Sequence, residues 1–477
     1  MNDIMLQGFE WYMNDCDNYW KWLSNEAKRL SSLGFNSIWI PPFCKATSVF
    51  DTGYGIYDLY DLGEFDQKGD IRTKYGTKED LLDAIDTCHK ENLLVFGDFV
   101  LNHKAGGDFT EECMAVKVDP NNREKELEEP KNILGWTGFN FPGRNKKYSP
   151  FIWHFQHFSG VNYDDKTKDT GIYKILKGDR DWNQGVSHEY GNYDYLMFSD
   201  IDHSDPDVKE EIFRWTDWVL EETGIDGIRF DALKHMDQSF IKELVEYIKE
   251  KKKDYYLFGE YWENNPDIFG EYLFHVNYEI DLFDVALHFH FVEAGKNQNY
   301  DLRNIFQHTL VKEHPLKAVT FVDNHDTQPG QALESTVADW FKPLAYGLIL
   351  LRKDGYPCVF YGDLYGVDGD FPMNSHCLWI EKLMKLRKKY ALGEEIDYFV
   401  DPKCIGWIRK KEDILAVVLS TGDSKGIEMD CGKEYAGKKF IDALDQCKEP
   451  IFANDQGKAV FYAPQRGMSA WIIASEN

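Results

Sequence analysis

The first hundred residues alternate short apolar runs with longer segments that place apolar residues at helical spacing. In the first of the helical segments Trp22, Leu23 and Ala27 fall on one face. Continuous apolar strands separated by helices are typical of a parallel sheet that is covered on both sides. The predicted elements are strands at residues 4–9, 36–40 and 93–100, and helices at residues 19–33 and 78–92.

The alternation stops between about residue 104 and residue 205. This segment is rich in Asp, Asn, Gly, Lys and aromatic residues and has no clear helical periodicity, which predicts an inserted subdomain. A helix at 206–222 resumes the pattern, and about eight strand–helix units in total are typical of a (β/α)8 barrel. The later strands are predicted at residues 226–231, 255–260, 282–287, 318–323 and 357–361.

Short alternating strands with Gly-rich turns begin at about residue 396 and predict a small antiparallel β domain. A chain of 477 residues is also too long for a single compact core. We therefore expect an α/β protein of three parts. These are a barrel of residues 1–103 and 206–395, an inserted subdomain of residues 104–205, and a C-terminal β-sandwich domain of residues 396–477.

The net charge of −28 argues against nucleic-acid and membrane partners, because such a surface repels phosphate backbones and anionic lipids. No apolar run is long enough to span a bilayer, and residues 1–3 carry no positive charge of the kind that opens a signal peptide. Nine cysteines without framework spacing fit a reducing compartment. We expect a cytoplasmic monomer. The aromatic content of 15% suits both core packing and sugar binding, and composition alone leaves these open.

Three strand-like runs end in acidic residues: Asp231, Glu260 and Asp326. Arg229 precedes Asp231 by two positions, so both side chains point to one face of a strand and the guanidinium holds the carboxylate ionised. Glu260 lies among aromatic residues, an environment that raises the pKa of a carboxyl group. One ionised and one protonated carboxyl group are what a retaining glycosidase needs.

Four segments, at residues 98–103, 227–235, 260–262 and 321–326, resemble in order and spacing the α-amylase family of glycoside hydrolases. The likeness covers nearly the whole chain and is strongest to bacterial liquefying-type, cytoplasmic α-amylases. It implies that Asp231 is the nucleophile, Glu260 the general acid/base and Asp326 the residue that stabilises the transition state.

The resemblance also implies a set of substrate-binding residues. His103 and His325 would donate to hydroxyl groups of the sugar at the cleavage point, and Tyr54 would stack beneath that sugar. Lys234 and His235 would contact the leaving-group side. The full implied set is Tyr54, His103, Arg229, Lys234, His235, Trp262 and His325.

A structural Ca²⁺ is implied as well, held by Asn102, Asp194, Asp200 and the backbone carbonyl of His235, which are hard oxygen ligands. Secreted relatives carry a second calcium and a sodium nearby. Here Asp202 remains and Asp181 is a further candidate for that group, but Ser159 and Ser204 stand where two of its acids would be. Lys403 likewise stands where an Asp ligand of a further calcium would be. We expect one calcium.

The function that follows is endo-acting hydrolysis of α-1,4-glucosidic bonds in glycogen, starch or maltodextrins. One alternative is an oligosaccharide-specific maltogenic hydrolase or an α-glucan transglycosylase of the same family. A more distant alternative is a non-catalytic glucan-binding protein, which the presence of all three carboxylates disfavours.

Overall fold

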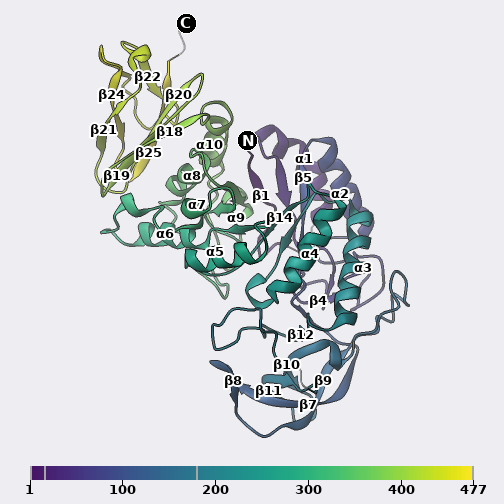
Figure 1. The fold of residues 1–477 in the computed structure, drawn as a ribbon. Coiled ribbons are helices and arrows are strands. Elements are labelled where there is room, and N and C mark those ends of the chain that lie inside the picture. The colour runs from purple at the N-terminus through teal and green to yellow at the C-terminus, as the bar shows by residue number, and fades with distance from the viewer. Residues whose placement is uncertain (1–2, 15–17, 179–180, 475–477) are drawn as a thin grey trace.

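Eight parallel strands close into a barrel in a computed structural model that describes residues 3–14, 18–178 and 181–474 (Figure 1). The strand order around the barrel is β1-β17-β16-β15-β14-β13-β5-β2. The predicted fold class is confirmed. The strands are β1 (Met5–Gln7), β2 (Ser37–Trp39), β5 (Leu94–Phe99), β13 (Gly227–Phe230), β14 (Tyr256–Gly259), β15 (Asp281–Phe283), β16 (Ala318–Phe321) and β17 (Tyr356–Phe360).

The helices begin and end where the local sequence allows. Thr77 and Asp80 form a reciprocal capping box at the start of α2, and Pro206 occupies the first turn of α3 behind the cap Asp205. Gly34 ends α1 at a φ of 112°, a conformation that suits glycine. The helices are α1 (Tyr19–Leu33), α2 (Lys78–Lys90), α3 (Pro206–Thr223), α4 (Gln238–Lys251), α5 (Pro266–His275), α6 (Val285–Lys296), α7 (Leu310–Glu313), α8 (Lys342–Leu350), α9 (Tyr361–Tyr365) and α10 (Cys377–Lys389). Short 3-10 turns are η1 (Phe155–His157), η2 (Leu233–His235), η3 (Leu302–Asn304) and η4 (Lys433–Tyr435).

One local prediction was wrong. The run predicted as a strand at 282–287 divides at Asp284, whose side chain accepts a hydrogen bond from the Leu287 amide and caps α6. On α1 the prediction that Trp22 lies on the apolar face agrees with its packing against the core beside the aromatic side chains of α9, and Trp20 is buried as well.

The segment between β5 and α3 forms its own antiparallel sheet, in the order β6-β12-β10-β11-β7-β8 with β9 beside β7. It is the lower lobe in Figure 1. Val116, Val118, Trp182 and Tyr195 make a small core of its own. The strands are β6 (His103–Lys104), β7 (Phe109–Asp119), β8 (Asn122–Glu126), β9 (Lys131–Gly138), β10 (Phe158–Asp164), β11 (Asp169–Ile175) and β12 (Ser199–Ile201), and the nearby pair is β3 (Lys45–Ala46) and β4 (Ile56–Asp58).

The C-terminal part is antiparallel, and its six-stranded sheet contacts a separate strand pair, β21 and β24 (Figure 1). Buried side chains from both, including Trp471 and Phe461, form a second hydrophobic cluster. The strands are β18 (Glu394–Asp401), β19 (Cys404–Lys410), β20 (Ile414–Ser420), β21 (Lys425–Asp430), β22 (Lys439–Asp442), β23 (Ile451–Phe452), β24 (Lys458–Ala463) and β25 (Gly467–Ile473).

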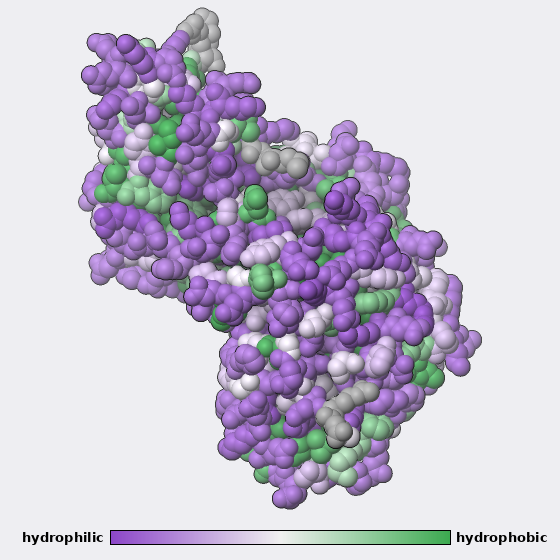
Figure 2. Space-filling view, viewed as in Figure 1, coloured by the Kyte–Doolittle hydropathy of each residue, from purple (hydrophilic) through white to green (hydrophobic). Residues whose placement is uncertain are grey.

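The face of the molecule seen in Figure 2 is largely hydrophilic, with scattered apolar side chains. Among the described helices none is both long and apolar enough to cross a membrane. The eight described cysteines are free thiols, and Cys16 lies outside the described residues.

Candidate active site at the carboxyl ends of the barrel strands

The three candidate carboxylates lie at one rim of the barrel. Asp231 and Glu260 directly follow β13 and β14, which are neighbours in the barrel. The Asp231 amide donates to Phe99 O at 3.1 Å and the Glu260 amide to Phe230 O at 3.0 Å, so both residues are fixed to the adjacent strand. Asp326 lies in the turn after β16, where its amide donates to Asn324 Oδ1 at 2.9 Å.

Arg229 is the centre of this rim. Its Nη1 lies 2.7 Å from Asp231 Oδ1 and 3.0 Å from Asp98 Oδ1, and its Nη2 donates to Glu260 Oε2. The side chain is 1% exposed. Sequence reasoning anticipated the contact with Asp231 but not those with Asp98 and Glu260. A signal for Asp98 was present, since an acid inside a buried apolar strand requires a partner.

Burial shifts the pKa of two of these carboxyl groups upward. Burial raises the pKa of Glu260 to about 8, against the attraction of Arg229 and with the help of Asp326 and Asp231. Burial also raises the pKa of Asp326 to about 7, again opposed by Arg229. Glu260 is therefore protonated at neutral pH while its oxygen lies on the same guanidinium that contacts Asp231.

An aromatic stack closes one side of the rim. The rings of Tyr54 and His325 are parallel with centroids 5.1 Å apart, and the nearly parallel ring of Trp11 lies 5.9 Å from Tyr54 and 6.1 Å from His325. Tyr54 OH donates to Asp98 Oδ2 at 2.9 Å, which ties the ring to the Arg229 cluster. Sequence reasoning did not select Trp11, because an isolated aromatic residue is usually part of a core.

The two histidines are neutral, because burial lowers the pKa of both His103 and His325. Gln7 Nε2 donates to His325 Nδ1 at 2.9 Å, so the ring proton is on Nε2, which lies 3.3 Å from Asp326 Oδ2. His103 Nε2 donates instead to the backbone carbonyl of Tyr54 at 2.8 Å. Its Nδ1 is then left as an acceptor.

Lys234 and His235 follow Ala232, a non-glycine residue in the left-handed region at a φ of 53°. Such strained backbone is frequent at functional sites. Lys234 Nζ contacts Glu189 and donates to the carbonyl of Trp262 at 3.0 Å. His235 Nδ1 donates to Tyr193 O at 2.9 Å. The short turn η2 thus links the barrel rim to the inserted sheet.

Three of the predicted calcium ligands, Asn102, Asp194 and Asp200, lie together where that sheet joins the barrel, and they fit a hard cation. Asn102 Oδ1 is buried without a hydrogen-bond partner among the described residues. Burial raises the pKa of Asp194 to about 7, and burial together with Asp194 raises that of Asp200. Two buried carboxyl groups and an orphaned amide oxygen form an oxygen-rich site with no described basic side chain paired to it.

The residues that the resemblance associates with further metal ions make contacts with lysine and serine side chains instead. Lys177 Nζ pairs with Asp202 and donates to Gln156 O at 3.1 Å, and Lys174 lies 3.0 Å from Asp181. Ser159 donates to Asp200, and Ser204 donates to Asp202 at 2.5 Å. Lys403 Nζ donates to the backbone carbonyls of Gln298 and Tyr300. Ammonium groups therefore lie at positions where the resemblance would place metal ions.

A separate group that the sequence did not suggest brings ligand atoms of His157, Asp205 and Asp207 within 4.8 Å of one another. Asp205 also caps α3 through the amides of Asp207 and Val208. This helix-capping role accounts for the position of its carboxylate.

Comparisons with known proteins agree with this geometry. Residues 19–397 match the family described as alpha amylase, catalytic domain. The chain is 45% identical to an alpha-amylase of Bacillus licheniformis over 99% of this chain and 94% of that protein. It is 40% identical to the cytoplasmic alpha-amylase of Escherichia coli K12 over 99% of both chains.

Two further comparisons concern product range and fold. The chain is 42% identical to a glucan 1,4-alpha-maltohexaosidase of a Bacillus species over 99% of this chain and 92% of that protein. The crystal structure of an Anoxybacillus alpha-amylase superposes with a TM-score of 0.67 at 20% identity, over 100% of this chain and 97% of that one. At that identity the structural match supports the barrel fold alone.

Proposed function

Because this chain belongs to the alpha-amylase family, we propose that it cleaves internal α-1,4-glucosidic bonds of α-glucans with retention of configuration. The observation that carries the proposal is the Arg229 guanidinium, which contacts Asp231 and Glu260 together. It places two carboxyl groups side by side, and burial keeps the proton on that of Glu260, an arrangement suited to double displacement at an anomeric carbon.

In the first step Asp231 attacks the anomeric carbon and forms a glycosyl ester while the bond to the glycosidic oxygen breaks. Glu260 donates its proton to that oxygen. The raised pKa of Glu260, about 8 through burial, supports this role, because the group still carries a proton at neutral pH. Arg229 Nη1, at 2.7 Å from Asp231 Oδ1, holds the nucleophilic side chain in position.

In the second step ionised Glu260 accepts a proton from water, whose oxygen attacks the anomeric carbon and releases Asp231. Asp326 and the Nε2–H of His325, 3.3 Å apart, would bind sugar hydroxyl groups more tightly as the ring flattens. Tyr54 supplies the stacking surface, and His103 positions Tyr54 through its backbone carbonyl. Lys234, His235 and Trp262 would contact sugar on the leaving-group side.

Homologues in this family are generally calcium-dependent, and we propose a single calcium here. Asn102, Asp194, Asp200 and the His235 carbonyl would hold it. The ion would tie the inserted sheet to the barrel rim and take no part in bond cleavage. Its charge would offset the two buried carboxylates, whose mutual repulsion otherwise opposes folding.

We propose that the chain divides into a barrel (1–103 and 206–395), an inserted subdomain (104–205) and a C-terminal domain (396–477). The likeness to a cytoplasmic amylase supports a cytoplasmic enzyme that acts as a monomer on glycogen, maltodextrin or starch, without nucleic-acid or membrane partners.

A narrower product range is the second candidate. The relative named as a maltohexaosidase is as similar to this chain as several alpha-amylases, so product length varies among close relatives. Rates on a long α-glucan and on maltotriose separate the two: an endo-acting enzyme prefers the polymer. Transfer activity would appear as products longer than the substrate.

The decisive experiment follows cleavage of maltoheptaose by proton NMR with wild type, Asp231→Asn and the exposed control Asp86→Asn on α2. We expect new α-anomeric ends from wild type and from the control, and none from Asp231→Asn. Initial β-anomeric ends would overturn the double displacement. Equal rates in all three proteins would overturn the assignment of Asp231.

A further inference from the structure

Two further aromatic side chains lie at the barrel rim beside the catalytic stack. Tyr12 lies in the segment after β1, and Phe371 lies in the turn after α9. Their rings are stacked, with centroids 5.3 Å apart and an angle of 19° between the planes. We call Tyr12 and Phe371 the rim pair. Tyr12 is the next residue after Trp11, whose ring lies beside Tyr54, so the rim pair adjoins the aromatic stack of the candidate active site.

Hydrogen bonds hold Tyr12 in place. Its hydroxyl donates to Pro329 O at 2.9 Å and accepts from Gln331 Nε2 at 2.8 Å. Its amide donates to Glu10 Oε2 at 2.7 Å. The protein therefore already uses the polar atoms of Tyr12, and its ring is a rigid support for Phe371. A rigid surface loses little entropy when a ligand binds to it.

Phe371 is held by its own turn and by a glycine. Val367 and Met373 exchange two backbone hydrogen bonds, of 3.0 and 2.9 Å, and close the turn that carries Phe371. A Cβ atom at Gly330 would lie 2.8 Å from Phe371 Cε1, so this glycine permits the close approach of the ring. Phe371 is 42% exposed even though it packs on Tyr12 and Gly330. Part of its ring therefore stays open to solvent.

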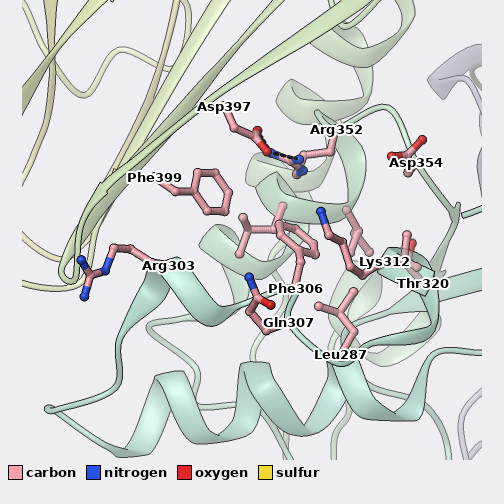
Figure 3. A pocket seen from close by; sticks show the side chains of 13 residues that line it. Leu287, Arg303, Phe306, Gln307, Lys312, Thr320, Arg352, Asp354, Asp397 and Phe399 are labelled. Atoms are coloured by element: carbon pink, nitrogen blue, oxygen red, sulfur yellow. Dashed lines mark hydrogen bonds and ion pairs between the residues drawn. The ribbon is translucent and has the colours of Figure 1, made fainter. Parts of the chain in front are cut away.

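A second aromatic pair shows the opposite arrangement. Phe306 and Phe399 line a cavity of about 330 Å³ between the barrel and the C-terminal domain (Figure 3). The Arg352 guanidinium lies 4.7 Å from the first ring centroid and 5.3 Å from the second. A cation of the protein thus packs against both rings, and neither is half as exposed as a ligand platform requires; Phe371 carries the open ring surface instead.

The surroundings of Phe371 favour a neutral, hydroxylated ligand. Asp368 and Asp370 are exposed in the same turn, and the chain as a whole carries a charge of −28, so an anionic ligand is repelled. Carboxylates accept hydrogen bonds from hydroxyl groups, and a flat ring covers the apolar face of a pyranose. One exposed phenylalanine beside two aspartates is too small and too charged for a stable protein interface.

The strand order places the rim pair across the barrel from the groups proposed for the leaving-group side. β14, which precedes Glu260 and Trp262, is the fourth strand from β1 in either direction around the barrel. Tyr12 follows β1, and Phe371 follows β17, a neighbour of β1. A glucan that runs from Trp262 past Glu260 therefore reaches the rim pair with its non-reducing, glycone part.

We propose that the rim pair binds a glucose unit on the glycone side of the cleaved bond, further from that bond than the unit on Tyr54. The inference rests on the proposed α-glucan hydrolysis and deepens it. The sugar ring stacks on the open surface of Phe371, which Tyr12 supports from below. Substrates that fill this position bind more tightly, so the rim pair favours cleavage of bonds that leave it occupied and sets the length of the product.

The first test follows cleavage of 4-nitrophenyl α-maltoheptaoside, whose labelled fragments show which bond is cut. We expect Phe371→Ala to raise KM about fivefold, because one aromatic contact with the substrate is lost, and to shift cleavage to other bonds. The penalty should be smaller on maltotriose, which has fewer glycone units. The control Phe452→Ala removes a ring that is 62% exposed in the C-terminal domain, and it should keep the wild-type KM and bond pattern.

Phe371→Tyr tests whether the ring itself is what matters. It should keep the wild-type bond pattern, because the flat surface is retained. A loss as large as that of Phe371→Ala would overturn the proposal, as would an unchanged bond pattern in Phe371→Ala or an equal penalty on maltotriose.

A binding measurement separates this proposal from the proposed hydrolysis. Maltoheptaose is titrated calorimetrically into Asp231→Asn and into Asp231→Asn/Phe371→Ala. A Kd raised about fivefold by Phe371→Ala supports the rim pair even if the wild type cleaves nothing, in which case the hydrolysis alone is wrong. An unchanged Kd overturns the rim pair as a sugar-binding site, whatever the wild-type rate.

Discussion

Two buried clusters, each built around one basic side chain, lie at the carboxyl ends of neighbouring parts of the barrel. Arg229 contacts Asp98, Asp231 and Glu260 at the rim that we assign to catalysis. Lys342, on α8, contacts Asp323 at 2.8 Å and also Asp363. In the first cluster three carboxyl groups share one cation, and in the second two carboxyl groups do.

The two clusters differ in the groups that donate hydrogen bonds to their carboxyl oxygens. In the Lys342 cluster Tyr346 OH donates to Asp363 at 2.7 Å and Thr327 Oγ1 to Asp323 at 3.0 Å, so protein groups occupy most of the oxygens. In the Arg229 cluster Glu260 has no donor other than Arg229 among the described residues, and burial raises its pKa to about 8; burial also raises the pKa of Asp323 in the Lys342 cluster, to about 7. A cluster that stabilises the fold satisfies its own charges, whereas a reactive one leaves a proton and a charge available to a substrate.

The largest contrast is expected from matched Asp→Asn changes in the two clusters. Asp231→Asn should lower kcat on maltoheptaose by about 10⁴-fold or more, because no nucleophile remains, with Tm nearly unchanged. Asp363→Asn should lower Tm and leave kcat of the folded enzyme within a few-fold of wild type. Progress curves and thermal unfolding measure both. The contrast fails if Asp363→Asn is inactive while fully folded.

Removal of the buried ammonium should be costly. Lys342→Met leaves Asp323 and Asp363 without their cation, and we expect a loss of about 3–5 kcal/mol in the free energy of unfolding. Denaturant titration measures it. The double variant Lys342→Met/Asp363→Asn should recover part of the loss, because fewer charges stay unpaired. A loss below about 1 kcal/mol would show that the cluster is not structurally important.

The calcium site is an intermediate case, with buried carboxyl groups and no internal cation among the described residues. Chelation with EGTA should lower Tm, by an amount equivalent to about 2.7 kcal/mol at a hundredfold excess over Kd. Asp200→Asn should abolish this sensitivity. Asp181→Asn, at an exposed residue paired with Lys174, serves as the control and should keep it. If EGTA has the same effect on both variants, the ion binds elsewhere.

The smallest effect is a pH dependence. The pKa of Glu260, raised by burial to about 8, predicts that kcat/KM falls about tenfold per pH unit above that value as the general acid loses its proton. The sign for stability follows: between the ordinary value of 4.5 and about 8 the folded chain holds a proton that the unfolded chain has released. Stability therefore falls as pH rises through this window.

Glu260→Gln separates this contribution from the rest. Its free energy of unfolding should decrease less than that of wild type between pH 6 and pH 8, since one titrating group has been removed. Parallel curves for the two proteins would count against a protonated Glu260 in the free enzyme.

Much of the fold was accessible from sequence because barrel strands are buried on both faces and read as continuous apolar runs. The strands of the inserted sheet could not be predicted in this way. In β7 and β8, for example, many positions are exposed and polar, and buried positions do not alternate regularly with them. Local capping was also missed at Asp284, where one carboxylate converts an apolar run into the start of a helix.

The candidate site was likewise predictable from the sequence only in part. Asp231, Glu260 and Asp326 end recognisable runs, and the spacing of Arg229 and Asp231 indicated their contact. The shared use of Arg229 by Asp98 and Glu260 depends on the side-by-side pairing of β5, β13 and β14, which no local pattern encodes.

The inserted sheet leaves and re-enters the barrel through paired strands, with His103 of β6 opposite Asp200 of β12. Its two ends are therefore adjacent, and the hundred or so residues between them form a closed loop whose entropic cost grows only slowly with length. A gene could lengthen, shorten or exchange this lobe without changing the register of any barrel strand. The inserted segment, and with it the range of substrates, can therefore change during evolution while the catalytic residues of the barrel stay the same.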